Sequence, residues 1–340
     1  MSRLTRFFLV LLAALAAAVV ATTAATPASS TTFSGRATAL QGNVLTIPLG
    51  PFADTGDVSA SGGALEANLL DLNQAGVSAE VLHATVFAGG SESKAQATLA
   101  SLSLADIAGT GNSVSASFLM AEATASCSNG TASISGGAEV ANLVVNGEPV
   151  VVTGAPNQEV SLPLGGKIVI NEQPVASASG GNGELTVNAL HIMIPGVADI
   201  VVASAHADIQ CGGGPPQCPS GNDFVTSGGW IDGTPTGARA NFGIAGGVKN
   251  GSLWGHLTYI DHGAGMKVKG TGVTAYTATG PTSRHIEGTA TINGDPGTYQ
   301  VDLNDKGEPG RNDTIQVAFS NGYTASDTLD GGNVQLHLCK

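Results

Sequence analysis

The sequence predicts an all-β protein, with two antiparallel β-sandwich-like domains in tandem after a signal peptide. The first half alternates with a period of two, as in "KAQATLASLSLADI" and "VSASFLMAEATASC", which is the period of a half-buried strand. The second half contains short strand-like runs between turn residues, which favours a sandwich or a barrel. Hardly any segment has a helical period. The best helix candidate, residues 63–76 ("GALEANLLDLNQAG"), fits a strand nearly as well.

The N-terminus has the pattern of a secretory signal. Arg3 and Arg6 precede an apolar run from Phe7 to Ala21, and small residues follow, so we interpret residues 1–28 as a cleaved signal peptide. The apolar run is shorter than the ~20 residues that a membrane-spanning helix needs. The ending "NVQLHLCK" has neither a hydrophobic tail nor a basic sorting cluster. We therefore expect a secreted protein, either extracellular or held at the cell surface by other means.

Charge and composition exclude several classes of partner. The chain has a net charge of −13, or about −15 without Arg3 and Arg6, and only 11% of its residues are charged. Nucleic acids and anionic lipids both need a basic surface, so neither is expected as a partner, and we expect no membrane insertion of the mature chain. An apolar content of 42% argues against disorder.

A change in composition indicates a domain boundary. Residues 31–210 contain four phenylalanines and no tryptophan or tyrosine, whereas residues 222–340 contain both tryptophans and all four tyrosines. The segment between them, residues 211–221, is rich in glycine and proline, as a linker is. We therefore predict two β domains, 31–210 and 222–340, and expect the second to fold on its own.

Strand-like runs and Asn-Gly pairs predict the local structure. The expected strands of the second half are 222–226, 239–244, 252–260, 266–276, 284–292, 298–304, 313–320 and 333–338. Pairs at 146–147, 250–251 and 321–322 predict hairpins, because both central residues of a type I′ turn need a positive φ. The pair at 293–294 is expected in a longer turn.

The first half contains two pairs of similar stretches. "LTIPLGP" (45–51) is similar to "VSLPLGG" (160–166), and "SASFLMAEATASC" is similar to "DIVVASAHADIQC", with a cysteine at each end. A duplication giving two related β-layers explains this, and so does chance alignment of low-complexity sequence.

Several longer stretches resemble known bacterial modules. "NDFVTSGGWI", "ANFGIAGGVKNGSLWGHLTYIDHGAGMKVKGTGVTAY", "HIEGTATINGDPGTYQVDLNDKGEPGRNDT" and "SNGYTASDTLDGGNVQLH" together resemble the post-COAP-1 domain, from about Asn222 to His337. The first half, with "AEVLHATVFAGG" and "FLMAEATASC", resembles the choice-of-anchor P family that commonly precedes that module. The resemblance implies an exported bacterial protein of the cell surface or its surroundings. It implies no known activity and no catalytic residues, and this chain lacks a recognisable C-terminal anchor.

The stretch "GSLWGHLTYIDHGAGMKV" (251–268) concentrates ligand-type side chains. His256, Asp261 and His262, joined by His285 from another strand, are a set that a transition metal would accept. The alternative, which we favour, is a strand and a turn. In that case Trp254 and Ile260 share a face with His256, Leu257 and Tyr259 point the other way, and Asp261 bonds its own backbone in the turn.

"DLNDKGEPGRND" (302–313) is similar to a calcium-binding loop. Asp302, Asn304, Glu308 and Asp313 are the candidate ligands, and no other cofactor is expected. Against calcium, the fifth place is Lys306, the twelfth is an aspartate instead of a glutamate, and no helices flank the loop. An acidic hairpin loop is the preferred interpretation.

The four cysteines are expected to form Cys127–Cys211 and Cys218–Cys339. Export places them where disulfides persist. Cys127 and Cys211 each end a strand-like stretch, and neighbouring strands of one sheet would bring them together. Cys218 and Cys339 flank the second domain, whose terminal strands often pair in sandwiches. The rival scheme has Cys211–Cys218, with Cys127 facing Cys339.

Two functions remain open. The first is a non-catalytic exported β protein of the surface, matrix or adhesion type, in which Trp230 or Trp254 could stack on sugar rings. The second is a secreted, glycosidase-like hydrolase with paired carboxylates. We identify no catalytic residues, and no serine lies in a G-x-S-x-G motif. A deep cleft with converging carboxylates would favour the enzyme, and flat sheet faces would favour the binding or structural protein.

Overall fold

The computed structural model describes residues 30–338, apart from residue 75 and residues 214–222. The expected signal peptide, most of the linker, Cys218 and Cys339 lie outside the described residues. Two 3-10 turns, Ile107–Gly109 and Pro163–Gly165, are the helical elements of the described part, and most of the remaining residues lie in strands. No helix there is long and apolar enough to cross a membrane. The all-β prediction is confirmed, and the helix candidate at 63–76 forms a strand, β3.

The first half consists of two antiparallel sheets. The six-stranded sheet has the order β10 (Gln158–Ser161), β11 (Lys167–Ser179), β12 (Asn182–Ile194), β13 (Ala198–Gln210), β1 (Thr32–Val44), β2 (Ile47–Asp54). The seven-stranded sheet has the order β3 (Gly63–Gln74), β4 (Val77–Gly89), β5 (Glu92–Leu104), β6 (Val114–Ser128), β8 (Val144–Val145), β9 (Glu148–Pro149), and β7 (Thr131–Ala141) also pairs with β6.

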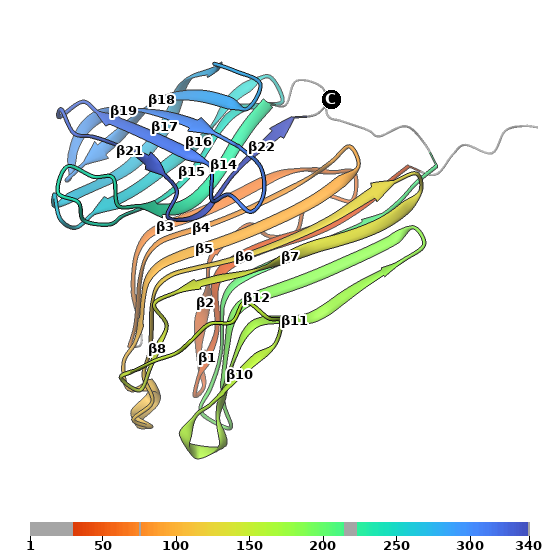
Figure 1. Ribbon diagram of the computed structural model, residues 1–340, viewed down its shortest axis with the longest axis vertical. Helices are drawn as coiled ribbons and strands as arrows, with labels where there is room; N and C mark the ends of the chain where they lie inside the picture. The colour runs from red at the N-terminus through yellow and green to blue at the C-terminus, as the bar shows by residue number, and fades with distance from the viewer. Residues whose placement is uncertain (1–29, 75, 214–222, 339–340) are drawn as a thin grey trace, which may run out of the picture.

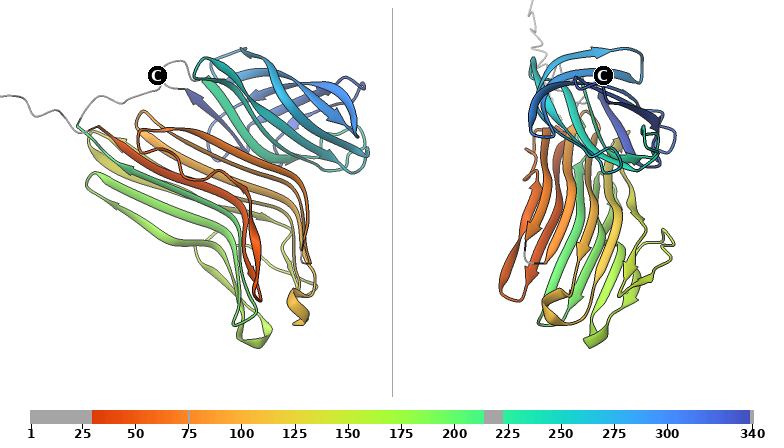
Figure 2. Two further views of the ribbon diagram at one scale, coloured as in Figure 1. Left: turned by 180° about the vertical axis from the view of Figure 1, so that it is seen from behind. Right: turned by 90° about the vertical axis from the view of Figure 1, so that its left-hand side faces the viewer.

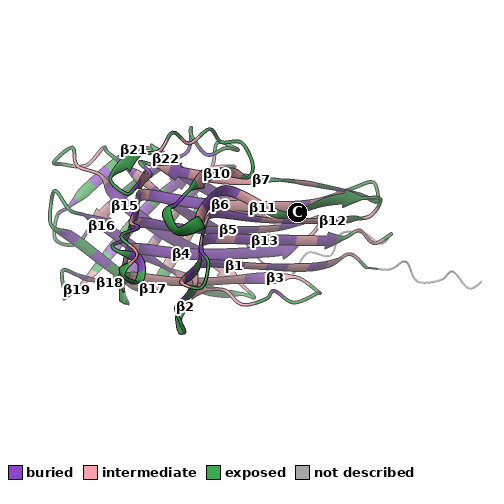
Figure 3. Ribbon diagram, turned by 90° about the horizontal axis from the view of Figure 1, so that it is seen from below, coloured by how far each residue is buried: buried purple, intermediate pink, exposed green. Residues whose placement is uncertain are grey.

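The two sheets of the first half face each other across one core. That core is built mainly from alanine, valine, leucine and isoleucine of both sheets, all from residues 33–209. Small side chains at alternate positions explain why the layers pack closely although the half has few aromatic residues. Buried positions run along the middle of the strands, and exposed positions gather at their ends and loops (Figure 3).

Several strands of this sandwich bend partway along their length (Figure 2). In the β4–β5 pair the register shifts twice between Ser78 and His83, and Val81 has a φ of 48°. Such irregularities are β-bulges, which bend a strand and increase its twist. The side chain of Val81 packs with Ala100 and with Ile260 of the second half, so the bend lies where the two halves meet.

A disulfide joins the two sheets of the first half. Cys127 lies near the end of β6 and Cys211 directly follows β13, with their Cα atoms 5.7 Å apart. The pairing predicted from the sequence is confirmed and the rival Cys211–Cys218 bond is excluded. The expected arrangement was wrong, because the two strands belong to facing sheets, not to one sheet. The similar stretches 115–127 and 199–211 thus form corresponding strands of the two layers.

The second half is one nine-stranded antiparallel sheet that curls around its own core as a half-barrel (Figure 1). Its order is β21 (Thr324–Thr328), β20 (Thr314–Phe319), β19 (Asp295–Asn304), β18 (Ser283–Ile292), β17 (Met266–Ala278), β16 (Ser252–Asp261), β15 (Ala240–Lys249), β14 (Asp223–Ile231), β22 (Gly331–Leu338). All eight expected runs form strands, and β21 was not predicted.

Two turns of the second half differ from expectation. The pair 321–322 lies in a hairpin, as predicted, but in a four-residue turn where only Gly322 has a positive φ. The second difference is the turn at 293–294. Asn293 and Gly294 have φ angles of 52° and 95° and are the only two residues between β18 and β19. They form a tight hairpin and not the longer turn that was predicted. Both residues have positive φ, which is the requirement that makes Asn-Gly the preferred pair for such turns.

The first and last strands of the second half pair with each other, which bears on the second disulfide. In the β14–β22 register Asp223 lies opposite Leu338. Cys339 follows Leu338 directly, and Cys218 precedes Asp223 by five positions. We therefore expect non-reducing peptide mapping of the protein, expressed in an oxidising compartment, to recover a Cys218–Cys339 peptide. Free thiols at these two positions after full oxidation would contradict the prediction.

The outer face of the seven-stranded sheet packs against the outer face of β14, β15, β16 and β22. Phe87 and Ala64 of the first half contact Phe224 of the second, and the half-buried Trp254 covers them. The rings of Phe87 and Phe224 meet edge to face, with centroids 5.7 Å apart. The half-barrel is thus seated on the sandwich through apolar and aromatic contacts.

Glycines of the second half make room for side chains of the first at this interface. A Cβ atom on Gly228 of β14 would lie 2.5 Å from Oγ1 and 2.7 Å from Cγ2 of Thr98. A Cβ atom on Gly243 of β15 would lie 2.8 Å from Cβ of His83. Real Cβ atoms do not approach so closely, so these two positions accept only glycine while the halves stay at their present distance.

We expect Gly228→Ala to lower the free energy of unfolding by about 1 to 3 kcal/mol, because overpacking forces neighbouring groups apart. Chemical denaturation measures the change. The double variant with Thr98→Ala removes the two closest atoms and should recover most of the loss. Gly272→Ala is the matched control, since its Cβ would meet only Thr289 Oγ1 at 3.8 Å. A Gly228→Ala protein as stable as the control would contradict close packing here.

Candidate functional site

The four side chains considered for a transition metal are not brought together. His262 lies 2.7 Å from Glu80 of the first half, and His285 pairs with Asp302 at 2.8 Å. Asp261 is buried, and its carboxylate accepts hydrogen bonds from the Ala264 backbone N–H and the Tyr323 hydroxyl. His256 lies at the interface between the halves, away from the others. His262, His285 and Asp261 therefore each have partners of their own.

The predicted faces of strand 252–261 are correct. Leu257 and Tyr259 belong to the core of the half-barrel, while Trp254 and Ile260 lie on the opposite face, as His256 does. The sequence did not reveal that this opposite face is covered by the first half. His256 is consequently buried and not displayed at the surface.

The candidate calcium ligands of the loop 302–313 each bond to different groups of the protein. Asp302 pairs with His285, and the buried Asp313 accepts hydrogen bonds from the backbone N–H groups of Lys306 and Val334. The side-chain oxygen of Asn304 accepts a hydrogen bond from Thr282. Within the described part of the chain, the ligand atoms of Asp302, Glu308 and Asp313 do not gather within 4.8 Å of one another. Hydrogen bonds within the protein hold this loop in place.

The two tryptophans proposed for sugar stacking already have partners. The guanidinium carbon of Arg239 lies 3.5 Å from the ring centroid of Trp230, so one face of that ring is covered. Trp254 meets Phe224 edge to face, with centroids 5.4 Å apart. Both rings are only half exposed, and they border the interface between the halves.

A cleft of about 710 Å³ lies where the second half meets the sandwich. Its walls come from β5, β6, β7, the segment around Gly154, β11, and the loop 308–311 of the half-barrel. Its volume suits a small-molecule ligand. The lining combines hydroxyl and amide groups with charged ones, including Thr124, Ser135, Asn171, Gln173, Lys94 and Arg311. Gly137 leaves space open on β7, because a Cβ atom there would meet only Asn171, at 3.8 Å.

Two carboxylates in this cleft share one amide donor. The side-chain nitrogen of Asn333 on β22 lies 3.3 Å from Oε2 of Glu122 and 2.8 Å from Oε2 of Glu308. The two carboxylate oxygens are therefore at most about 6 Å apart, and Gln335 donates to the other oxygen of Glu122 at 3.0 Å. The sequence signal for Glu122 was an acidic residue inside a run of apolar and small residues, which is unusual in a strand with two covered faces.

Burial alters the protonation of this pair. It raises the pKa of Glu122 to about 7, and the negative charge of Glu308 adds to the shift. Burial likewise raises the pKa of Glu308. Lys94 and the amide donors act in the opposite direction but do not cancel the effect. Glu122 is therefore a carboxylic acid that holds its proton to near neutral pH, and it can donate a hydrogen bond or a proton there.

A third carboxylate fastens the edge of the half-barrel to the sandwich. Oε2 of Glu139 on β7 accepts a hydrogen bond from the backbone N–H of Gly332 at 3.1 Å. Together with Glu122, it ties β22 to β6 and β7. The acids of the cleft thus hold the two halves together as well as lining the cavity.

No family model and no curated protein matches the chain. Two solved structures show weak similarity. An AttH-like protein from Nitrosomonas europaea is 9% identical, with 90% of this chain and 92% of that chain covered at a TM-score of 0.22. Kievitone hydratase from Nectria haematococca is 11% identical, with 90% and 88% covered at a TM-score of 0.18. TM-scores this low support no argument about fold or function.

Proposed function

We propose that the protein is an exported bacterial β protein of the cell surface or its surroundings, which binds a hydroxyl-rich ligand such as a carbohydrate segment without transforming it. The observation that carries the proposal is the cleft between the halves, with its lining of hydroxyl, amide and carboxyl groups. Neutral sugars are recognised by dense hydrogen bonding of this kind. The resemblance to the choice-of-anchor P and post-COAP-1 modules supports the surface location, and the disulfide suits an oxidising compartment.

The hydrogen bonding of the acids favours binding over catalysis. Both oxygens of Glu122 accept bonds from amide side chains of β22, and Glu139 bonds the backbone of the same strand. Carboxylates held by such hydrogen bonds have a structural role in the lining of the cleft. Thr124, Ser135 and Gln173 are further hydrogen-bonding groups that line the cleft.

A glycan array followed by calorimetry on the retained glycans tests the proposal. Gly137→Leu should abolish binding, because a side chain at this position points into free space beside Asn171, with its nearest contact at 3.8 Å. Gly280→Leu is the matched control outside the cleft, where the added Cβ would meet only Ser283 at 3.5 Å. No glycan retained, or equal binding by both variants, would overturn the proposed cleft.

The Glu122–Glu308 pair supports a second candidate, a glycosidase-like hydrolase. Retaining glycosidases place an acid of raised pKa about 5 to 5.5 Å from a second carboxylate. An acid with a pKa of about 7 and a partner oxygen at most about 6 Å away meet that description in part.

Product analysis after prolonged incubation with each retained glycan separates the two functions. The hydrolase requires cleavage whose rate falls at least 100-fold in Glu122→Gln, with a pH limb near 7 in the parent protein. Such cleavage would show that the protein is a hydrolase and would overturn the proposal of binding without catalysis. Intact glycans would support binding without catalysis.

A further inference from the structure

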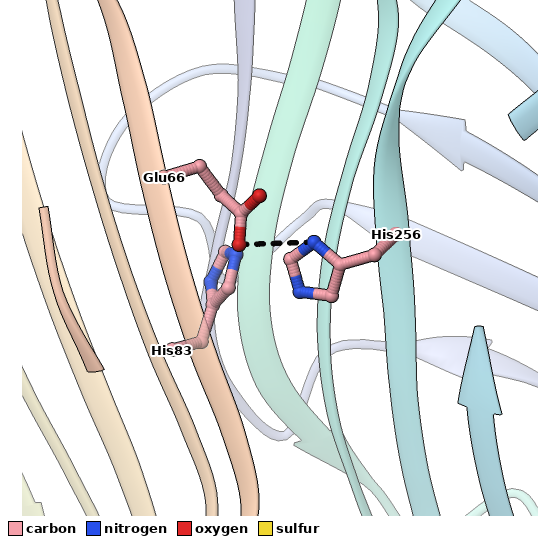
Figure 4. Close-up of side chains that lie close together, drawn as sticks. All are labelled: Glu66, His83 and His256. Carbon is pink, nitrogen blue, oxygen red and sulfur yellow. Dashed lines mark ion pairs between the residues drawn. The ribbon is translucent and has the colours of Figure 1, made fainter. Parts of the chain in front are cut away.

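Three ligand-type side chains from both halves converge at the buried interface (Figure 4). Glu66 on β3 and His83 on β4 come from the sandwich, and His256 on β16 comes from the half-barrel. One ligand atom of each lies within 4.8 Å of the others, and no further such group of three occurs among the described residues. Nδ1 of His256 lies 2.9 Å from Oε1 of Glu66.

Three of the four imidazole nitrogens of this cluster are buried without hydrogen-bond partners. His83 is 1% exposed and His256 is 8% exposed. Nε2 of His83 and both ring nitrogens of His256 make no hydrogen bond, since the approach to Glu66 is close but not aligned for one. A buried polar atom without a hydrogen-bond partner is destabilising. Three such atoms in one place indicate that a bound ligand or ion satisfies them.

The surroundings hold the cluster in a form suited to a cation. Asn68 donates to Oε1 of Glu66 at 3.1 Å and orients the carboxylate. The absent side chain of Gly243 leaves the space that His83 occupies. The nearby ammonium of Lys249 is directed to the backbone carbonyl of Ala64.

We propose that Glu66, His83 and His256 bind a divalent transition-metal ion, with zinc as the best match, and that this ion clasps the half-barrel to the sandwich. Two neutral imidazoles and one carboxylate form a common zinc ligand set, with metal–ligand distances of about 2.0 to 2.2 Å. Ligand atoms within 4.8 Å of one another reach that geometry with movements of a fraction of an ångström to about one ångström. The three protein ligands leave a fourth position for water or a ligand.

The test uses the full exported chain without a histidine tag, freed of metal by a chelator and then titrated with zinc or cobalt(II). We expect one equivalent of zinc by elemental analysis and calorimetry, and a rise in melting temperature with zinc concentration, because the ion binds the folded state. Cobalt(II) should give the intense visible absorption of a four-coordinate site. This spectrum requires no variant and therefore does not depend on a substituted protein folding.

Variants identify the ligands. Glu66→Gln and His83→Ala should each weaken zinc affinity at least 100-fold and remove the thermal shift. His262→Ala, an exposed histidine at the same interface that pairs with Glu80, should bind zinc as the parent does. Failure of the folded parent to bind one equivalent of either metal would overturn the proposal. So would binding that survives in both Glu66→Gln and His83→Ala. Glycan binding in the cleft, measured on the same samples, is a separate readout.

Discussion

Replacing both Cys127 and Cys211 by alanine is expected to lower the free energy of unfolding by about 4 to 5 kcal/mol. The bond closes a loop of 84 residues, and in the chain-entropy model a loop of this length restricts the unfolded chain by that amount. It also joins two facing sheets at the ends of β6 and β13, so its loss frees the layers at that end. Calorimetry should show a melting temperature lower by roughly 7 °C.

Reduction of the parent protein provides the control. A reducing agent should bring the parent down to the stability of the double variant, and any further drop measures what the cysteines at 218 and 339 contribute. A double variant that melts with the oxidised parent would show that the bond does not restrict the unfolded chain as supposed.

The second large effect concerns pH. Glu122 holds a proton in the folded protein up to a pKa of about 7, whereas the unfolded chain releases it near 4.5. The folded state therefore binds more protons between these values, and its stability falls as the pH rises through this window and levels off above it. A pKa moved from 4.5 to about 7 corresponds to about 3 kcal/mol. Asp313, whose pKa burial raises to about 6, adds an effect of the same sign.

Glu122→Gln isolates this contribution, because an amide imitates the protonated acid. The free energy of unfolding of the variant, minus that of the parent, should increase by about 3 kcal/mol as the pH rises from 5 to 8. Denaturation at each pH measures this difference. Glu148→Gln, on the exposed β8–β9 hairpin, should follow the parent at every pH. Parallel curves for Glu122→Gln and the parent would show that the buried acid is not protonated near neutrality.

The two-residue alternation of apolar side chains and the residue preferences of tight turns explain why so much of the fold could be predicted. Strands β18, β19 and β20 of the half-barrel have one face on its core and the other more exposed, so their alternation is visible locally. Asn-Gly pairs fix the hairpins at 146–147 and 250–251. The strand β21 was missed because "TASDT" is short and polar, with only Ala325 reaching the core. The stretch 63–76 was ambiguous because β3 contacts neighbours on both faces, which blurs its alternation.

The sites could not be predicted because no local spacing encodes them. The cleft combines β6 and β7 with a loop that begins at Glu308, far along the chain. Glu66, His83 and His256 meet only because two separately formed sheets pack face to face. The sequence does hold a partial signal, a charged or imidazole side chain within an otherwise apolar strand. Such a residue indicates burial with a partner but does not identify the partner.

The glycines at the interface also limit how these halves can be inherited. Gly228 and Gly243 have no side chains, and this leaves the space that Thr98 and His83 of the other half occupy. A half-barrel moved by recombination onto an unrelated sandwich would meet either voids or clashes at these points. The two halves should therefore be passed on as a matched pair, and substitutions at these four positions should appear together in descendants.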